Sequence, residues 1–375
     1  MLKKLSLYVH IPFCIQKCYY CDFASFVCNS DVQDKYTTYL LKEIDLIKDN
    51  FKGHYLDTVF FGGGTPTNLT EKNLLLIMNK IKASFYIDDD AEFSIECNPK
   101  TADFNKFKFL RELGFNRLSI GVQALDDDIL RKIGRAHNVK DFLECYASLK
   151  LAGFENVNYD LMFALPDQRF EDFKKTARDI VKFKPTHISC YSLTLEENTP
   201  LYKNIHKYYT ADDEENRNMY GFAKKFFEEN GYLQYEISNF AKRGFECRHN
   251  LKYWELGEYI GIGSSASSFF NNARHTNPHL IEDYMKFIDD YKFPYIEPTE
   301  TEKDLMGEFM FLGLRKTNGI KDKEFTELFN KSFFDVYKEE IENNMQKGLL
   351  IKENDTIKLT TKGQDLANIV MSDFV

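Results

Sequence analysis

The sequence predicts an α/β fold, with a run of parallel βα units followed by a smaller α+β module. Short apolar strands alternate with amphipathic helical stretches six times between residue 5 and about residue 236. Gly114, Gly153 and Gly231 stand where three of these helices should end. Such units form either an open parallel sheet or a partial barrel, and in both the ligand site lies at the carboxyl ends of the strands.

Each element of the repeat has a sequence pattern that supports it. Strands are predicted at 5–11, 57–61, 92–97, 117–122, 156–162 and 187–193. Helices are predicted around 36–51 and at 71–84, 103–113, 139–152, 170–183 and 214–230. The acidic run 88–90 is expected in a solvated loop, and the acidic run 126–128 in the first turn of a helix.

The C-terminal part has a different pattern. Helices are predicted near 302–315, 323–329 and 334–345, then a hairpin of strands 349–352 and 356–359, then a last helix. This order predicts a winged-helix-like module that acts in docking or as a lid. The domain division is therefore 1–236 for the core, 237–298 for an extension that ends in a linker at 294–301, and 299–375 for the module.

Composition excludes several classes of function. The chain has 375 residues and a net charge of -9, and residues 300–375 hold 15 acidic and 11 basic residues, so nucleic acid is not an expected partner. There is no apolar run of membrane-spanning length, although peripheral membrane contact through a partner stays open. Eight dispersed cysteines favour a reducing cytoplasm, and the five outside the N-terminal loop are expected to be buried.

Three cysteines lie close together directly after the first strand. Cys14, Cys18 and Cys21 have the spacing Cys-x3-Cys-x2-Cys, which is typical of metal ligands. A structural zinc site needs a fourth protein ligand, and no cysteine or histidine follows within the next few residues. A cubane iron–sulfur cluster held by three thiolates leaves one iron open. The cluster is the favoured interpretation, with zinc or a disulfide as the alternatives.

Polar residues and glycines follow the later strands. The glycine run 62–64 with Thr65 can bring backbone amides close to a ligand, or it is only a flexible turn. Glu96 can pair with a ligand ammonium group, or it helps to cap a helix. Gln123, Arg135 and Asp160 offer an acceptor, an anion clamp and a ribose-binding carboxylate, although each alone would be an ordinary hydrogen-bonded group.

A second motif, His249-Asn250-x-x-Tyr253-Trp254, follows the sixth unit. It contains the only tryptophan of the chain. The motif either closes the open barrel and faces the cofactor, or forms a hydrogen-bonded turn packed under the barrel.

These motifs together resemble the radical SAM superfamily, in which S-adenosylmethionine (SAM) binds the open iron of a [4Fe-4S] cluster. Within it they resemble the coproporphyrinogen dehydrogenase-like branch, over nearly the whole chain. This resemblance implies a radical SAM partial (β/α)6 TIM-like barrel with a C-terminal α+β winged-helix-like domain. It implies cluster ligation by Cys14, Cys18 and Cys21, with SAM as the exchangeable fourth ligand. It also implies first-SAM contacts from Tyr8, Gly63 and Glu96, and second-SAM contacts from Tyr20, Gly64, Thr65, Gln123, Arg135 and Asp160.

Three features favour the heme-chaperone members of this branch over the dehydrogenase. The dehydrogenase has a fourth cysteine where this chain has Phe23, it has a long N-terminal extension, and the motif 249–254 is associated with the chaperone. The resemblance thus implies heme as cargo and apo-hemoproteins of the respiratory chain as partners. The alternatives are oxygen-independent coproporphyrinogen III dehydrogenation and an iron–sulfur docking protein without turnover. The heme ligand is not determined by the sequence, and His10, His249 and a free cysteine are the candidates. The sequence does not determine the oligomeric state either.

Overall fold

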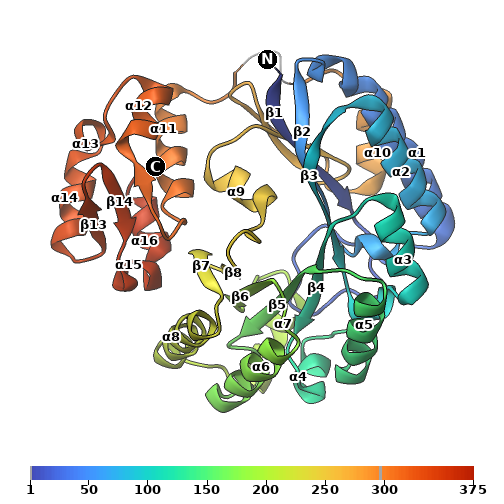
Figure 1. Cartoon of the computed structure of the whole chain (residues 1–375), viewed down its shortest axis with the longest axis horizontal. Coiled ribbons are helices and arrows are strands. Elements are labelled where there is room, and N and C mark those ends of the chain that lie inside the picture. The colour runs from blue at the N-terminus through green and yellow to red at the C-terminus, as the bar shows by residue number, and fades with distance from the viewer. Residues whose placement is uncertain (1, 295–297) are drawn as a thin grey trace.

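The computed structural model describes residues 2–294 and 298–375 and shows a curved parallel sheet with helices along its outer side (Figure 1). Strands β1 to β6 lie side by side in chain order. Their bounds are Lys3–Ile11, His54–Gly63, Tyr86–Cys97, Arg117–Gln123, Asn156–Phe163 and His187–Ser192. The outer helices are α1 (Ser30–Ile47), α2 (Glu71–Ser84), α3 (Phe104–Leu113), α5 (Val139–Leu151), α6 (Phe170–Lys182) and α8 (Asp213–Glu229). The six parallel strands, which follow one another in a curved sheet, thus form a partial barrel.

The regular elements follow the sequence patterns closely. All six predicted strands and all six predicted helices are present, and α2 has the predicted bounds. Gly114, Gly153 and Gly231 have positive φ angles directly after their helices, the conformation in which glycine is favoured. The side chain of Asp126 caps the short helix α4 (Asp127–Lys132), as its acidic first turn predicts.

Two features of the sheet differ from the prediction. Strand β3 begins at Tyr86, so the acidic run 88–90 lies in a strand and the predicted loop is wrong. The sheet also continues beyond β1 and β6 through five short strands to a total of eleven among the described residues. These are β7 (Leu233–Glu236), β8 (Asn239–Ala241), β9 (Tyr259–Ile262), β10 (Ser267–Phe270) and β11 (Ala273–Thr276). Strand β9 pairs in parallel with β1, and β8 pairs antiparallel with β6.

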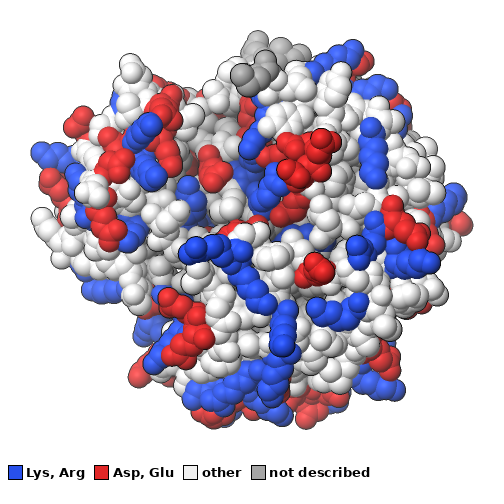
Figure 2. All heavy atoms as spheres, in the orientation of Figure 1, with Lys and Arg blue, Asp and Glu red and all other residues white. Residues whose placement is uncertain are grey.

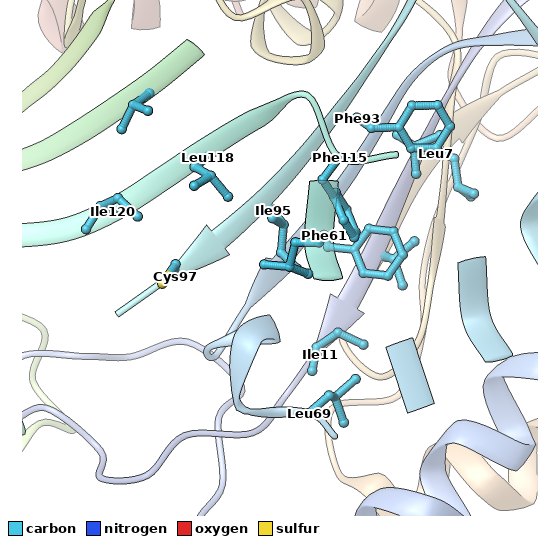
Figure 3. Close-up of a cluster of buried hydrophobic side chains, with 14 of the residues drawn as sticks. Leu7, Ile11, Phe61, Leu69, Phe93, Ile95, Cys97, Phe115, Leu118 and Ile120 are labelled. Atoms are coloured by element: carbon cyan, nitrogen blue, oxygen red, sulfur yellow. The ribbon is translucent and has the colours of Figure 1, made fainter. Parts of the chain in front are cut away.

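The main core lies between the outer face of this sheet and its helices. Figure 3 shows buried side chains from neighbouring strands, among them Leu7 and Ile11 of β1, Phe61 of β2 and Ile95 of β3. Side chains alternate between the two faces of a strand. Tyr8 and His10 of β1 therefore point away from this core and line a cavity on the inner side.

The C-terminal domain has its own hydrophobic core, which includes Met310, Phe325 and Ile357. Its elements are α11 (Glu302–Gly313), β12 (Ile320–Lys321), α12 (Asp322–Phe329), α13 (Phe333–Val336), α14 (Lys338–Gln346), β13 (Leu350–Glu353), β14 (Thr356–Leu359), α15 (Thr361–Asp365) and α16 (Ala367–Ser372). Helices with a small antiparallel sheet agree with the winged-helix-like prediction. The predicted linker at 294–301 lies partly outside the described residues.

Specific contacts join this domain to the barrel side of the molecule. Arg274 of β11 makes two hydrogen bonds to the Glu308 carboxylate of α11, at 2.7 and 2.6 Å. Arg315 bonds the buried Glu236 of β7 at 3.2 Å. Helices α9 (Arg248–Trp254) and α10 (Ile281–Asp289) belong to the extension between the two parts, and α9 lies at the open side of the barrel (Figure 1).

The surface carries both signs of charge. Lysine and arginine side chains are interspersed with aspartate and glutamate over the face seen in Figure 2, including the C-terminal domain. In the described part of the chain, no helix has the length and apolarity needed to cross a membrane.

Candidate functional site

The cysteine loop is closed at its base by backbone hydrogen bonds. Cys14 N–H donates to Phe26 O at 3.0 Å, and Phe26 N–H donates to Pro12 O at 2.7 Å. The three thiols are half-buried and free, and they line one cavity of about 390 Å³ at the carboxyl ends of the strands. Burial raises the pKa of Cys14 and of Cys21 above the ordinary value of a thiol.

The cysteine loop offers three thiols, the number that a cubane cluster with one open iron needs. Among residues 2–294 and 298–375, no three His, Cys, Asp or Glu side chains are arranged to hold one metal ion. The thiolate ligands of a cubane need not converge on one metal ion, because each of them binds a different iron. Arg135 donates to Cys18 Sγ at 3.5 Å, a contact that suits a negatively charged sulfur.

The glycine run after β2 packs directly against the cysteine loop. Gly64 N–H donates to Ile11 O at 2.9 Å. A Cβ atom on Gly64 would lie 2.9 Å from the Phe13 backbone and 3.1 Å from Cys14 Sγ. Gly63 has a φ of +110° and would place a Cβ 2.6 Å from the His10 ring. The run is therefore closely packed, and the flexible-turn alternative is wrong.

Glu96 lies at the end of β3, on the wall of the same cavity. Its carboxylate accepts a hydrogen bond from Gly63 N–H at 3.2 Å. Burial, followed by the charge of Asp160, raises the pKa of Glu96 to about 8. The helix-capping alternative is wrong, because Asn98 and Thr101 form the capping box of the 3₁₀ turn Pro99–Thr101.

The predicted second group of contacts also lines this cavity. It comprises Tyr20, Gly64, Thr65, Gln123, Arg135 and Asp160. Arg135 is buried and donates to Gly121 O at 2.6 Å and to Asn98 Oδ1. Asp160 accepts from Asn158 Nδ2 at 2.7 Å. The guanidinium and the carboxylate are therefore fixed in position before any ligand binds.

Tyr8 and the motif 249–254 occupy neighbouring cavities. Tyr8 lines two of them, of about 380 and 240 Å³, and both also contact Glu96. The motif forms helix α9, which places His249, Asn250 and Tyr253 on the smaller cavity inside the barrel. Trp254 instead lines an outer pocket of about 270 Å³ next to the C-terminal domain. The motif is thus a helix, where the alternative was a turn, and three of its four residues face the interior.

Several residues of the site were not predicted from the sequence. Asn98 donates to Thr65 Oγ1 at 2.7 Å and accepts from Arg135, so it joins two predicted contacts. Tyr191, at the end of β6, donates to Gln123 Oε1 at 3.3 Å. Arg117 is 2% exposed and lines the smaller inner cavity. Asn98 and Tyr191 could have been predicted as site residues, because both lie at the carboxyl ends of strands. Arg117 lies at the start of β4, and nothing in the sequence marks it as a site residue.

Comparisons with known proteins agree with this geometry. The model of the radical SAM superfamily matches residues 8–180, and that of the HemN C-terminal domain matches residues 301–366. The solved structure of coproporphyrinogen III oxidase (HemN) from Escherichia coli, described as a radical SAM enzyme, has a TM-score of 0.87. It is 23% identical, covering 100% of this chain and 90% of that one, which shows the fold alone.

Fold and cysteine loop together define a radical SAM protein with a HemN-type C-terminal domain. The heme chaperone HemW of Bacillus subtilis (strain 168) is 37% identical over 374 residues, which is 99% of each chain. The heme chaperone HemW of Escherichia coli (strain K12) is 38% identical over 269 residues, with 71% of this chain and 70% of that protein covered. The chain belongs to the HemW family, which confirms the resemblance inferred from the motifs.

Proposed function

We propose that this protein is a heme chaperone that binds heme and delivers it to apo-hemoproteins such as respiratory cytochromes. The observation that carries the proposal is the similarity to proteins named heme chaperone HemW over 99% of both chains. The identity of residue 23 adds support, because Phe23 stands where the related dehydrogenase has a fourth cysteine.

In this proposal the protein also carries a [4Fe-4S] cluster and SAM. Cys14, Cys18 and Cys21 would hold three irons, and when bound the cluster supplies an open iron and one electron to SAM. Glu96 would receive the amino group of SAM, since a buried carboxylate pairs well with an ammonium. Arg135 and Asp160 would hold a second nucleoside-like ligand in the same cavity. These side chains bind and orient, and the surrounding barrel excludes water.

The test of the chaperone function is a hemin titration of the purified, anaerobically reconstituted protein. A saturable shift of the Soret band at one heme per chain is expected, followed by loss of that heme to an apo-cytochrome added in excess. Lack of saturation near one equivalent would contradict the proposal.

A second candidate is oxygen-independent dehydrogenation of coproporphyrinogen III. The observation that favours it is the cavity, which is lined by the three cysteines and by all the expected SAM contacts except Tyr8. An anaerobic assay with coproporphyrinogen III, SAM and a reductant separates the two candidates. The chaperone proposal expects no appreciable protoporphyrinogen, whereas turnover would favour the dehydrogenase.

A further inference from the structure

A continuous chain of hydrogen bonds runs from the barrel interior through the sheet. Tyr253 Oη lies 2.8 Å from His249 Nε2, and His249 Nδ1 lies 2.7 Å from Thr58 Oγ1. Thr58 Oγ1 donates to Ser6 Oγ at 2.8 Å, and Ser6 Oγ donates to Asp57 Oδ1 at 3.1 Å. Ser6, Asp57, Thr58 and His249 are all buried. Four links therefore connect a phenol on α9 with a carboxylate on β2.

The Asp57 carboxylate at the end of the chain fixes the direction of each hydrogen bond. The Asp57 carboxylate only accepts, and it is paired with Lys252 Nζ at 2.9 Å. Ser6 therefore uses its single proton toward Asp57, and Thr58 uses its own toward Ser6. Since Thr58 has no second proton, His249 must donate from Nδ1. The buried chain thus selects one tautomer of His249.

In this tautomer His249 Nε2 carries no proton and accepts the hydrogen bond of Tyr253. The phenol proton can leave if every proton in the chain moves one step toward Asp57. His249 then exchanges one tautomer for the other and is never charged. Burial, with further contributions from Arg117 and Lys252, lowers the pKa of His249 to about 3, so this neutral route avoids an imidazolium.

Tyr253 borders three cavities of the molecule. Tyr253 lines the two inner cavities and also the outer pocket. Tyr8 and Glu96 border both inner cavities as well, so the two cavities adjoin each other. Neither ring nitrogen of His249 is available to a metal, because Thr58 and Tyr253 occupy both.

We propose that Tyr253, as a phenolate, is the axial ligand of ferric heme, with His249, Thr58, Ser6 and Asp57 as positioning residues that accept its proton. This assignment rests on the proposed heme-binding function. The Tyr253 O–H bond breaks, an oxygen–iron bond forms, and one proton arrives at Asp57 while the iron stays ferric. Tyrosine is an established ligand of ferric heme, and the anionic oxygen favours the ferric over the ferrous state.

The experiment compares the unaltered full-length protein with Tyr253→Phe, which keeps the ring and removes the oxygen. Hemin titration and resonance Raman spectroscopy of the ferric complex should show iron–tyrosinate bands that Tyr253→Phe abolishes. Ferric affinity should fall at least tenfold with ferrous affinity unchanged, which raises the heme midpoint potential by about 59 mV for each factor of ten. The matched control is Tyr259→Phe, because the two rings are 4.6 Å apart and the Tyr259 hydroxyl faces Arg274 instead of the chain.

A second variant tests the proton chain itself. Asp57→Asn still accepts from Ser6 but takes up no proton, so the tyrosinate bands should weaken and the potential should rise. Tyrosinate bands that persist in Tyr253→Phe would overturn the assignment, as would a nitrogen-ligand spectrum that is lost only in His249→Gln. Absence of saturable heme binding by the unaltered protein overturns the proposed function together with this inference, whereas the other outcomes concern the ligand alone.

Discussion

Single residues at the strand ends determine what the main cavity can bind, and Glu96 has the most specific requirement. Burial and the charge of Asp160 raise the pKa of Glu96 to about 8, so its carboxyl group holds a proton at neutral pH. A ligand ammonium pairs only with the carboxylate, so binding releases that proton. The affinity for SAM should therefore rise by about tenfold per pH unit between about pH 6 and 8.

Calorimetry of SAM binding at several pH values, in buffers of different ionisation enthalpy, measures this proton release. Glu96→Gln should bind SAM more weakly and lose the pH dependence, since an amide has no proton to release. If the SAM affinity of Glu96→Gln still rises with pH, the released proton comes from another group.

A second residue-scale prediction concerns the glycine next to the cluster loop. Gly64→Ala should impair cluster incorporation, because the added Cβ would meet the Phe13 backbone at 2.9 Å and Cys14 Sγ at 3.1 Å. The iron and sulfide content after reconstitution measures the effect. Gly221→Ala is the matched control: it lies inside α8 with nothing within 4 Å of its Cβ, so stability should rise by about 0.5–1 kcal/mol.

The strand-end position of a residue could be predicted from the sequence, but its partner often could not. The carboxyl ends of parallel strands meet at one edge, which is why Glu96, Gln123 and Asp160 were predicted to lie together. Asn98 contacts Thr65 and Arg135, which are 33 and 37 positions away. Such pairings depend on the register between strands, and a single sequence does not contain it.

Among the elements, α1 is held to the extension by a buried carboxylate. Glu43 accepts from Gly263 N–H and Tyr284 Oη, at 2.8 and 2.7 Å, and also from Asn277. Burial raises the pKa of Glu43 to about 7, despite these hydrogen bonds. The folded state therefore binds more protons than the unfolded state between about pH 4.5 and 7, and its stability falls as the pH rises through this window.

The stability lost through Glu43 should amount to about 3 kcal/mol across that window. Urea unfolding at a series of pH values measures it. Glu43→Gln should remove this part of the pH dependence, because the amide does not ionise. Asp45→Asn, on the exposed side of the same helix, should leave it in place; equal pH profiles for the unaltered protein and Glu43→Gln would contradict the assignment.

Elements with many periodic residues were predicted well, whereas most of the short strands were missed; the exceptions are β13 and β14, whose hairpin was predicted. Helix α2 has fourteen residues and a clear apolar face, whereas β7 to β11 have three or four residues each. Four residues contain too few alternations to distinguish a strand from a loop. The run 88–90 lies within strand β3, between the residues 86–87 and 92–95 that pair with β2, and the register shifts at this point. The low strand propensity of aspartate therefore did not reveal the strand.

At the scale of the whole molecule, the C-terminal domain is joined to the barrel side through Arg315. Its guanidinium lies 4.3 Å from the centre of the Trp254 ring and bonds Glu236, which is fully buried. Removal of the arginine leaves a buried carboxylate without its countercharge. Arg315→Met should therefore lower the free energy of unfolding by about 3 kcal/mol or more.

The double variant Arg315→Met with Glu236→Gln should recover most of that loss, because it removes the unpaired charge together with its partner. Urea denaturation of the two single variants and the double variant measures the coupling as a thermodynamic cycle. Arg131→Ala is the surface control, since Arg131 and Asp128 are 74% and 72% exposed and their pairing contributes little. Strictly additive losses would mean that the two side chains stabilise the molecule independently.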